Sequence, residues 1–367
     1  MSTESTPAPQ RRLVLVTGAG RSGTSTVAGT LHHLGLHVPL PVLKANESNP
    51  LGFFESWWPV RFHKRLFEIA NVEQTDTRPE ALAAVKDVID DVQRDRLRTW
   101  LTDVMAESDQ VVVKDPRSLF VPQLWAETAA ELGVSTGYVT MLRHPAEVVG
   151  SRSTYYGAGR DAWMFAVSNL AAWVNGNLIV ERETRGRPRS VVRYNDLLED
   201  WRGVMHDVAQ TCGLDLGDAL TAESHPVDDF IDPSLRRHEP SWEGLDMPAD
   251  LVAVAEGVFA AMSRLADSQG SDAAAEAEMD ELAERYAQLV RVAQAVAQDT
   301  TKVAARAARR QGEEHVREEV AAQQAAAMPA PEPVPAPGPE PWTTRVTRAA
   351  RRRLPEPVKR VLRKALR

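Results

Sequence analysis

The segment Val14–Thr26, VLVTGAGRSGTST, decides the fold of this chain. It predicts an apolar strand, a glycine-rich turn and the first turn of a helix. This arrangement points backbone N–H groups and the positive end of a helix dipole at one place, which forms a cradle for an anion. Gly18, Gly20 and Gly23 permit positive φ angles and a close approach of the backbone. The segment therefore predicts a phosphate-binding loop.

This loop differs from a nucleotide-hydrolysing Walker loop. Gly18 and Gly23 have the Walker spacing, but Thr24 stands where that motif has lysine, and the cation comes earlier, at Arg21. Further hydroxyl donors come from Ser22, Ser25 and Thr26. The loop therefore favours phosphate binding without ordinary ATP hydrolysis.

Three further β-rich segments follow, at Val111–Val113, Gly137–Leu142 and Ser190–Tyr194. The helical patterns around them are Thr24–Leu34, Pro59–Ala70, Pro79–Ala106, Leu119–Leu132, Ala146–Ser153, Asp161–Thr184 and Asp196–Cys212. This alternation predicts an α/β fold over residues 11–245, with a mostly parallel sheet of the P-loop-NTPase kind flanked by helices and followed by a C-terminal helical extension.

Four motifs fall at the predicted carboxyl ends of the strands, at Gly18, Lys114, Arg143 and Tyr194. Ligands of such sheets collect at these ends, so the four motifs are expected to face one crevice. Ser151 follows Arg143 by eight residues, within the next predicted helix. The guanidinium of Arg143 and the hydroxyl of Ser151 can bind a second phosphate together.

These motifs resemble the sulfotransferases that use 3′-phosphoadenosine-5′-phosphosulfate (PAPS). Arg21–Ser25 is similar to the family's loop for the 5′-phosphosulfate, and Arg143 with Ser151 to its 3′-phosphate site. Tyr194 begins a segment similar to its adenine-binding element. Asn49–Glu55 and Lys114–Arg117 are similar to segments of bacterial members. The resemblance implies PAPS as co-substrate, bound by Gly18, Gly20, Arg21, Ser22, Gly23, Thr24, Ser25, Thr26, Arg143, Ser151 and Tyr194.

Catalysis of sulfuryl transfer needs a base and positive charge. Glu55 is the candidate base, because the aromatic pair before it removes water from the carboxylate; a helix cap or an ion-pair partner is the alternative. Arg21 and Lys114 are the candidates for charge stabilisation. His63 is a further catalytic candidate, but a structural histidine on a helix face or at the edge of the core is the favoured interpretation. No metal is expected, because the sequence has no Cys pair and no His residues at ligand spacing.

The acceptor is predicted to be a hydroxyl of a carbohydrate or glycolipid. Besides Glu55, this rests on Trp57 and Trp58, whose rings can stack on a sugar or pack in the core. Arg236 is a further candidate for the 3′-phosphate, or a solvated loop arginine. Two other functions stay open: a Mg²⁺-dependent nucleotide kinase of the P-loop class, and a non-catalytic scaffold tethered to a membrane.

The compartment and the remaining segments follow from composition. The single cysteine, Cys212, and a polar tail at residues 1–10 without a secretion signal favour a cytoplasmic protein. The net charge is −8, yet residues 342–367 carry ten Lys and Arg against one Glu. This basic segment predicts an amphipathic helix on anionic lipid at the inner face of a membrane, with a solvated tail or nucleic acid as the less favoured alternatives.

A helical extension is predicted at residues 248–327, before a Pro-rich linker at 328–341. It contains an apolar seam that alternates steps of three and four, and its members are Met279, Leu282, Tyr286, Leu289, Ala293, Val296, Thr300, Val303 and Ala307. Two structures fit this seam: a helix that lies along the domain, and a coiled coil that makes a homodimer.

Overall fold

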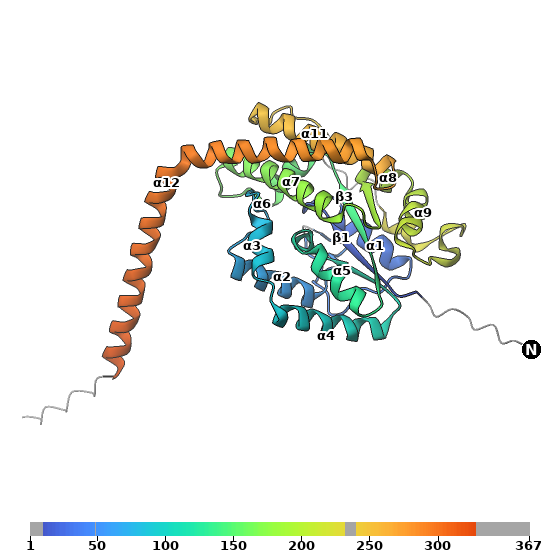
Figure 1. Cartoon of the computed structure of the whole chain (residues 1–367), viewed down its shortest axis with the longest axis horizontal. Helices are drawn as coiled ribbons and strands as arrows, with labels where there is room; N and C mark the ends of the chain where they lie inside the picture. The colour runs from blue at the N-terminus through green and yellow to red at the C-terminus, as the bar shows by residue number, and fades with distance from the viewer. Residues whose placement is uncertain (1–9, 48, 232–239, 328–367) are drawn as a thin grey trace, which may run out of the picture. The chain divides into compact units, whose positions relative to one another are not determined.

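The computed structural model of the chain describes residues 10–47, 49–231 and 240–327 (Figure 1). Met1–Val296 form one compact unit and Ala297–Arg367 a second, whose described part belongs to helix α12 (Ala273–Ala327). Most of the predicted N-terminal tail, the Pro-rich linker, the basic segment and Arg236 lie outside the described residues. The predictions for these parts stay predictions.

The first unit contains a four-stranded sheet in the order β2-β1-β3-β4, and every neighbouring pair is parallel. Its strands are β1 (Arg12–Thr17), β2 (Gln110–Lys114), β3 (Ser135–Leu142) and β4 (Arg189–Arg193). The expected parallel sheet flanked by helices is confirmed. Because the strands are parallel, all four carboxyl ends lie at the same edge of the sheet.

Side chains of β1 alternate between the two faces of the sheet, as the two-residue period of a strand requires. Leu13 and Leu15 pack in one apolar cluster, and Val14 and Val16 in another. The helices that contribute to the first cluster are α2 (Trp57–Ala70), α3 (Ala81–Asp87), α4 (Asp91–Glu107), α5 (Pro122–Glu131) and the later part of α7 (Ala162–Thr184). Those of the second are α1 (Thr24–His33), α8 (Tyr194–Glu199), α9 (Trp201–Cys212) and α10 (Pro226–Phe230). Both faces of the sheet are thus covered.

Two of the predicted helices are each divided in the structure. The segment Pro79–Ala106 forms α3 and α4, because Asp90 caps a new helix by accepting a hydrogen bond from the Gln93 N–H at 3.1 Å. Asp200 separates α8 from α9 in the same way, accepting from the Gly203 N–H at 3.0 Å. Capping satisfies N–H groups that the start of a helix leaves unpaired, so a short polar residue can begin a helix inside a periodic pattern. The described part of this unit also contains two 3₁₀ helices, η1 (Pro116–Phe120) and η2 (Gly217–Leu220).

A third apolar cluster lies beside β4 and includes the beginning of the helical extension. The helices that build it are α6 (Pro145–Tyr156), α7 (Ala162–Thr184), α11 (Ala249–Asp267) and the start of α12. Arg189 links β4 to α7 and α12. Its buried guanidinium forms ion pairs with Glu181 of α7 at 3.1 Å and with Glu276 of α12 at 2.7 Å. The start of α12 is therefore part of the same core as α7.

The apolar seam of the extension changes character along α12. Met279, Leu282 and Tyr286 are buried in the third cluster, as expected for a helix that lies along the domain. Val296 and Val303 are 81% and 64% exposed. The predicted coiled-coil dimer stays a prediction for this later part. No helix within the described residues is both long and apolar enough to cross a membrane.

Candidate active site

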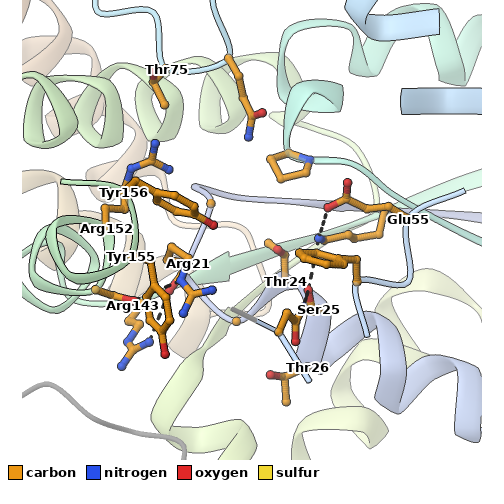
Figure 2. A pocket seen from close by; sticks show the side chains of 18 of the residues that line it. Arg21, Thr24, Ser25, Thr26, Glu55, Thr75, Arg143, Arg152, Tyr155 and Tyr156 are labelled. Atoms are coloured by element: carbon orange, nitrogen blue, oxygen red, sulfur yellow. Dashed lines mark hydrogen bonds and ion pairs between the residues drawn. The ribbon is translucent and has the colours of Figure 1, made fainter. Parts of the chain in front are cut away.

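A polar pocket of about 520 Å³ opens at the carboxyl ends of the four strands (Figure 2). Segments that follow β1, β3 and β4 meet the last residue of β2 there, as expected from the strand order. The predicted site residues that line it are Gly20, Arg21, Gly23, Thr24, Ser25, Thr26, Glu55, Lys114, Arg143, Ser151 and Tyr194. The fold thus brings residues between positions 20 and 194 of the chain to one cavity.

The shape of the glycine-rich loop depends on two glycines with positive φ angles, Gly18 and Gly23. Gly18 has φ 124°, and a Cβ there would lie 2.7 Å from the carbonyl oxygen of Met141 on β3. Gly23 has φ 94° and occupies the N-cap position of α1. The first N–H groups of this helix therefore lie at the pocket. Gly18 does not line this pocket, and neither does Ser22, which is buried and donates its N–H to the Ala19 carbonyl at 3.1 Å. These two residues shape the loop.

Lys114 and Glu55 form an ion pair at one side of the pocket. The Lys114 Nζ lies 2.5 Å from Glu55 Oε1 and 3.3 Å from Ser25 Oγ, while Asn49 Nδ2 donates to Ser25 Oγ at 2.9 Å. Glu55 is 8% exposed and Lys114 3%, so water screens the pair weakly. Ser56, not Glu55, occupies the cap position of α2. Glu55 is therefore an ion-pair partner that also faces the pocket.

Arg143 and Arg21 form a second cluster around Ser151. Arg143 donates from Nε to Glu147 at 2.6 Å, and its guanidinium lies 4.6 Å from the centre of the Tyr194 ring. Its Nη2 is buried and has no hydrogen-bond partner among the described residues. Arg21 donates from Nε to Ser151 Oγ at 3.1 Å. The Arg21 side chain therefore lies on Ser151, while its backbone carbonyl accepts from Arg143 Nη1 at 3.3 Å.

Tyr194 closes the pocket beside the loop. It begins helix α8, whereas the sequence predicted it as the last residue of a strand. Its ring fills the space that a Cβ on Gly23 would take, with Cδ2 only 2.3 Å from that position. Burial raises the pKa of Tyr194, against the opposing charge of Arg143, so its hydroxyl remains neutral near pH 7.

His63 does not reach the pocket. It is fully buried, with Nδ1 2.9 Å from Asp115 Oδ2 and Nε2 accepting from the indole N–H of Trp125 at 3.0 Å. Because an indole nitrogen only donates, Nδ1 carries the proton of the imidazole. Burial opposes the charge of Asp115, but the hydrogen bond from His63 and the charge of Arg117 hold the pKa of Asp115 well below its usual range. These hydrogen bonds and ion pairs hold the segment after β2 in position.

We expect the His63→Ala substitution to lower the free energy of unfolding by about 2–3 kcal/mol, because it leaves buried groups of Asp115 and Trp125 without a partner. Urea denaturation of the variant measures this loss, and His206→Ala, an exposed histidine on α9, is the control. A His63→Ala variant that keeps its stability but loses turnover would instead indicate a catalytic role.

The tryptophan pair does not form a sugar platform in this pocket. Trp58 stacks on Phe62 and Trp100, with ring centroids 5.0 and 4.7 Å apart, and so packs against the core. Trp57 is 38% exposed beneath the guanidinium of Arg61 and does not line the pocket. Consecutive positions on a helix point about 100° apart, so the two rings could not share one surface.

Several residues that line the pocket were not among the predicted site residues. They are Glu73, Gln74, Thr75, Arg152, Tyr155, Tyr156, Arg160 and Phe165. Arg152 and Tyr155 follow Ser151 within the same helix and could have been predicted from that motif. The segment 73–75 lies far from every motif, and only packing brings it to the pocket.

A comparison with protein-family models matches residues 14–218 to the sulfotransferase family. The match covers more than half of the chain, including the loop, Lys114, Arg143 and Tyr194. The chain belongs to the sulfotransferase family. Membership supports sulfotransferase activity, and hence an enzyme with a small-molecule donor and an acceptor.

Solved structures similar to this sulfotransferase-family chain include two sulfotransferase domains. One is from the olefin synthase of Synechococcus PCC 7002, with 17% identity, a TM-score of 0.41, and coverage of 71% of this chain and 98% of that one. The other is from the curacin biosynthetic pathway, with 16% identity, a TM-score of 0.37, and coverage of 70% and 99%. A comparison with curated protein sequences gave no significant match.

Proposed function

We propose that this chain moves a sulfuryl group from PAPS to a hydroxyl of an acceptor, by in-line transfer without a metal. The observation that carries the proposal is the division of the pocket into two cationic clusters around one glycine-rich loop. Lys114 lies with Ser25 and Glu55 in one cluster, and Arg143 lies with Arg21 and Ser151 in the other. PAPS carries two separate anionic groups, and the two clusters can each take one.

Within this proposal, the loop and the first turn of α1 hold the 5′-phosphosulfate, because their N–H groups and hydroxyls face the pocket. Arg143 and Ser151 bind the 3′-phosphate. The buried and unpartnered Nη2 of Arg143 supports this role, since such a donor gains most from an anionic acceptor. Tyr194 packs against the guanidinium beside it and lies near the adenine.

In the transfer step, the acceptor oxygen attacks the sulfur while the bond from sulfur to the phosphate oxygen breaks. The leaving bisphosphate keeps the electron pair, and its charge is held by Arg21 and Arg143. Lys114 stabilises the sulfuryl oxygens, and Glu55 takes the acceptor proton. Glu55 Oε1 accepts from Lys114, whereas Oε2 has no hydrogen-bond partner among the described residues and is available to the acceptor. Fixed cations and N–H donors supply the positive charge that a metal would otherwise provide.

For the acceptor we propose a carbohydrate or glycolipid hydroxyl, supported by the polar lining of the pocket and by the Glu55 carboxylate. For the setting we propose a cytoplasmic enzyme held at a membrane by residues 342–367. We also propose that the chain forms a homodimer through the later part of α12.

The donor assignment is tested by calorimetric titration with 3′-phosphoadenosine-5′-phosphate (PAP). We expect the Arg143→Ala substitution to weaken PAP binding about 10- to 100-fold, because it removes charged hydrogen bonds. Since this variant also leaves the buried Glu147 carboxylate unpaired, Arg143→Lys keeps a cation there and tests the loss of the guanidinium fork alone. Turnover of PAPS should persist in EDTA.

The matched control is Arg94→Ala, which removes an exposed ion pair with Glu127 and should leave PAP affinity unchanged. Binding of ATP with Mg²⁺ but not of PAP would contradict the donor assignment and favour a nucleotide kinase. Equal PAP affinity in the wild type and both Arg143 variants would remove Arg143 from the donor site.

A further inference from the structure

Arg152 and Gln74 approach each other above Gly20 of the glycine-rich loop, and the donor assignment uses neither of these side chains. A Cβ on Gly20 would lie 3.1 Å from Arg152 Nη1 and 3.8 Å from Gln74 Nε2, so both donors reach the same point above a bare backbone. Figure 2 shows Arg152 beside Thr75 and Tyr156, at a different part of the pocket from Arg143. Two N–H donors that converge on one point are suited to an oxyanion.

The positive charge at this place is not neutralised by the protein. Among the described residues, neither Arg152 nor its neighbour Arg160 forms an ion pair with a carboxylate, and the Gln74 amide has no hydrogen-bond partner. Burial and the repulsion of Arg21 and Arg160 lower the pKa of Arg152. When an anion binds, it reduces the electrostatic repulsion among neighbouring cations that have no acidic partner.

The segment that carries Gln74 is held firmly in place. Asn175 of α7 donates to the Asp76 carbonyl at 2.9 Å, and the Tyr286 hydroxyl of α12 lies 2.6 Å from the Thr77 carbonyl oxygen. Arg152 is fixed in turn by a hydrogen bond from its Nε to Asn169 Oδ1. Because the Arg152 side chain and the backbone that follows Gln74 are already held, an anion can bind here at a reduced cost in conformational entropy.

We propose that Arg152 and Gln74, with Arg160 at the rim, bind an anionic group of the acceptor. The inference rests on the proposed function and narrows its substrate class to an alcohol that also carries a carboxylate or a phosphate. The donor's anions have their own partners at the Lys114 and Arg143 clusters, which leaves this third cationic place to the acceptor. Arg160 lies 5.0 Å over the Phe165 ring and extends the positive surface to the pocket entrance.

The test uses the full chain saturated with PAP, so that the donor site is filled, and three probes on one scaffold. Glucose 6-phosphate, glucuronate and glucose are titrated by calorimetry. We expect at least one of the two anionic sugars to bind about tenfold or more tightly than glucose, and the better of them identifies a phosphate or a carboxylate. Arg152→Gln should remove most of this difference and Arg160→Gln a smaller part, whereas Arg94→Gln should not change it.

PAP affinity separates this proposal from the one on which it rests. If the wild type does not bind PAP, the donor assignment itself fails. If PAP binds but glucose binds as well as both anionic sugars, the anionic acceptor site is overturned. An Arg152→Gln variant with weakened PAP binding would also overturn it, because Arg152 would then belong to the donor site; unchanged PAP affinity shows in addition that the variant is folded.

Discussion

Replacing Glu55 by glutamine is expected to lower the turnover number of sulfuryl transfer by about 10²- to 10⁴-fold, the range over which a positioned base accelerates proton transfer. The Glu55 side chain is almost buried, it faces the pocket, and Lys114 holds one of its oxygens at 2.5 Å. Glutamine has the same shape and can still accept from Lys114, but its amide cannot take a proton from the acceptor. The loss should therefore appear in turnover and not in the affinity for PAP.

Single-turnover kinetics with labelled PAPS measure this loss, and PAP titration verifies that the donor site is intact. Glu68→Gln is the matched control, because Glu68 is an exposed carboxylate on α2 that pairs, within the described part of the chain, with Arg65 at 3.5 Å. A Glu55→Gln variant with wild-type turnover would move the base elsewhere and leave Glu55 as the partner of Lys114.

The Gly23→Ala substitution is expected to abolish measurable PAP binding and to lower the free energy of unfolding by about 2–5 kcal/mol. An L-residue at φ 94° is strained by about 1–2 kcal/mol. The new methyl group would also lie 2.3 Å from the Tyr194 ring, and such overpacking costs a further 1–3 kcal/mol or so. Relief of the clash requires Tyr194 or the start of α1 to move, and both line the pocket.

The Gly35→Ala substitution separates the effect of backbone strain from the effect of the clash with Tyr194. Gly35 has φ 98°, almost the angle of Gly23, yet a Cβ there meets nothing within 4 Å. We expect this control to lose only the strain of the backbone and to bind PAP normally. Equal stability losses in the two variants, with PAP binding intact in both, would contradict the close packing of Tyr194 on the loop. Urea denaturation and calorimetry measure the two quantities.

The sheet and the loop follow from local patterns in the sequence. Leu13 to Val16 form an uninterrupted apolar run, which is typical of a strand covered on both faces, and the glycines after it mark the turn. The strand ends were predicted to within a residue or two, so the meeting of Lys114, Arg143 and the loop could be expected from parallel topology alone. Helix breaks at Asp90 and Asp200 were missed, since a cap competes with periodicity over only a few residues.

The direction of individual side chains could not be predicted in this way. Arg21 belongs to the predicted loop, and its Nε donates to Ser151 Oγ, a partner 130 positions along the chain. Trp58 packs against Trp100, which lies on another helix, and His63 is enclosed by Asp115 and Trp125. Each of these outcomes depends on a partner far away in the chain.

The sequence by itself therefore determined the α/β class, the glycine-rich loop and the family, because strand period, glycine spacing and motif order are local properties of the chain. Only the tertiary structure decided which side chains contact one another inside the pocket at the strand ends. The ion pair of Lys114 with Glu55, and the convergence of Arg152 with Gln74 over Gly20, join residues 59 and 78 positions apart. Packing of the helices on the sheet creates those contacts, and no local pattern encodes them.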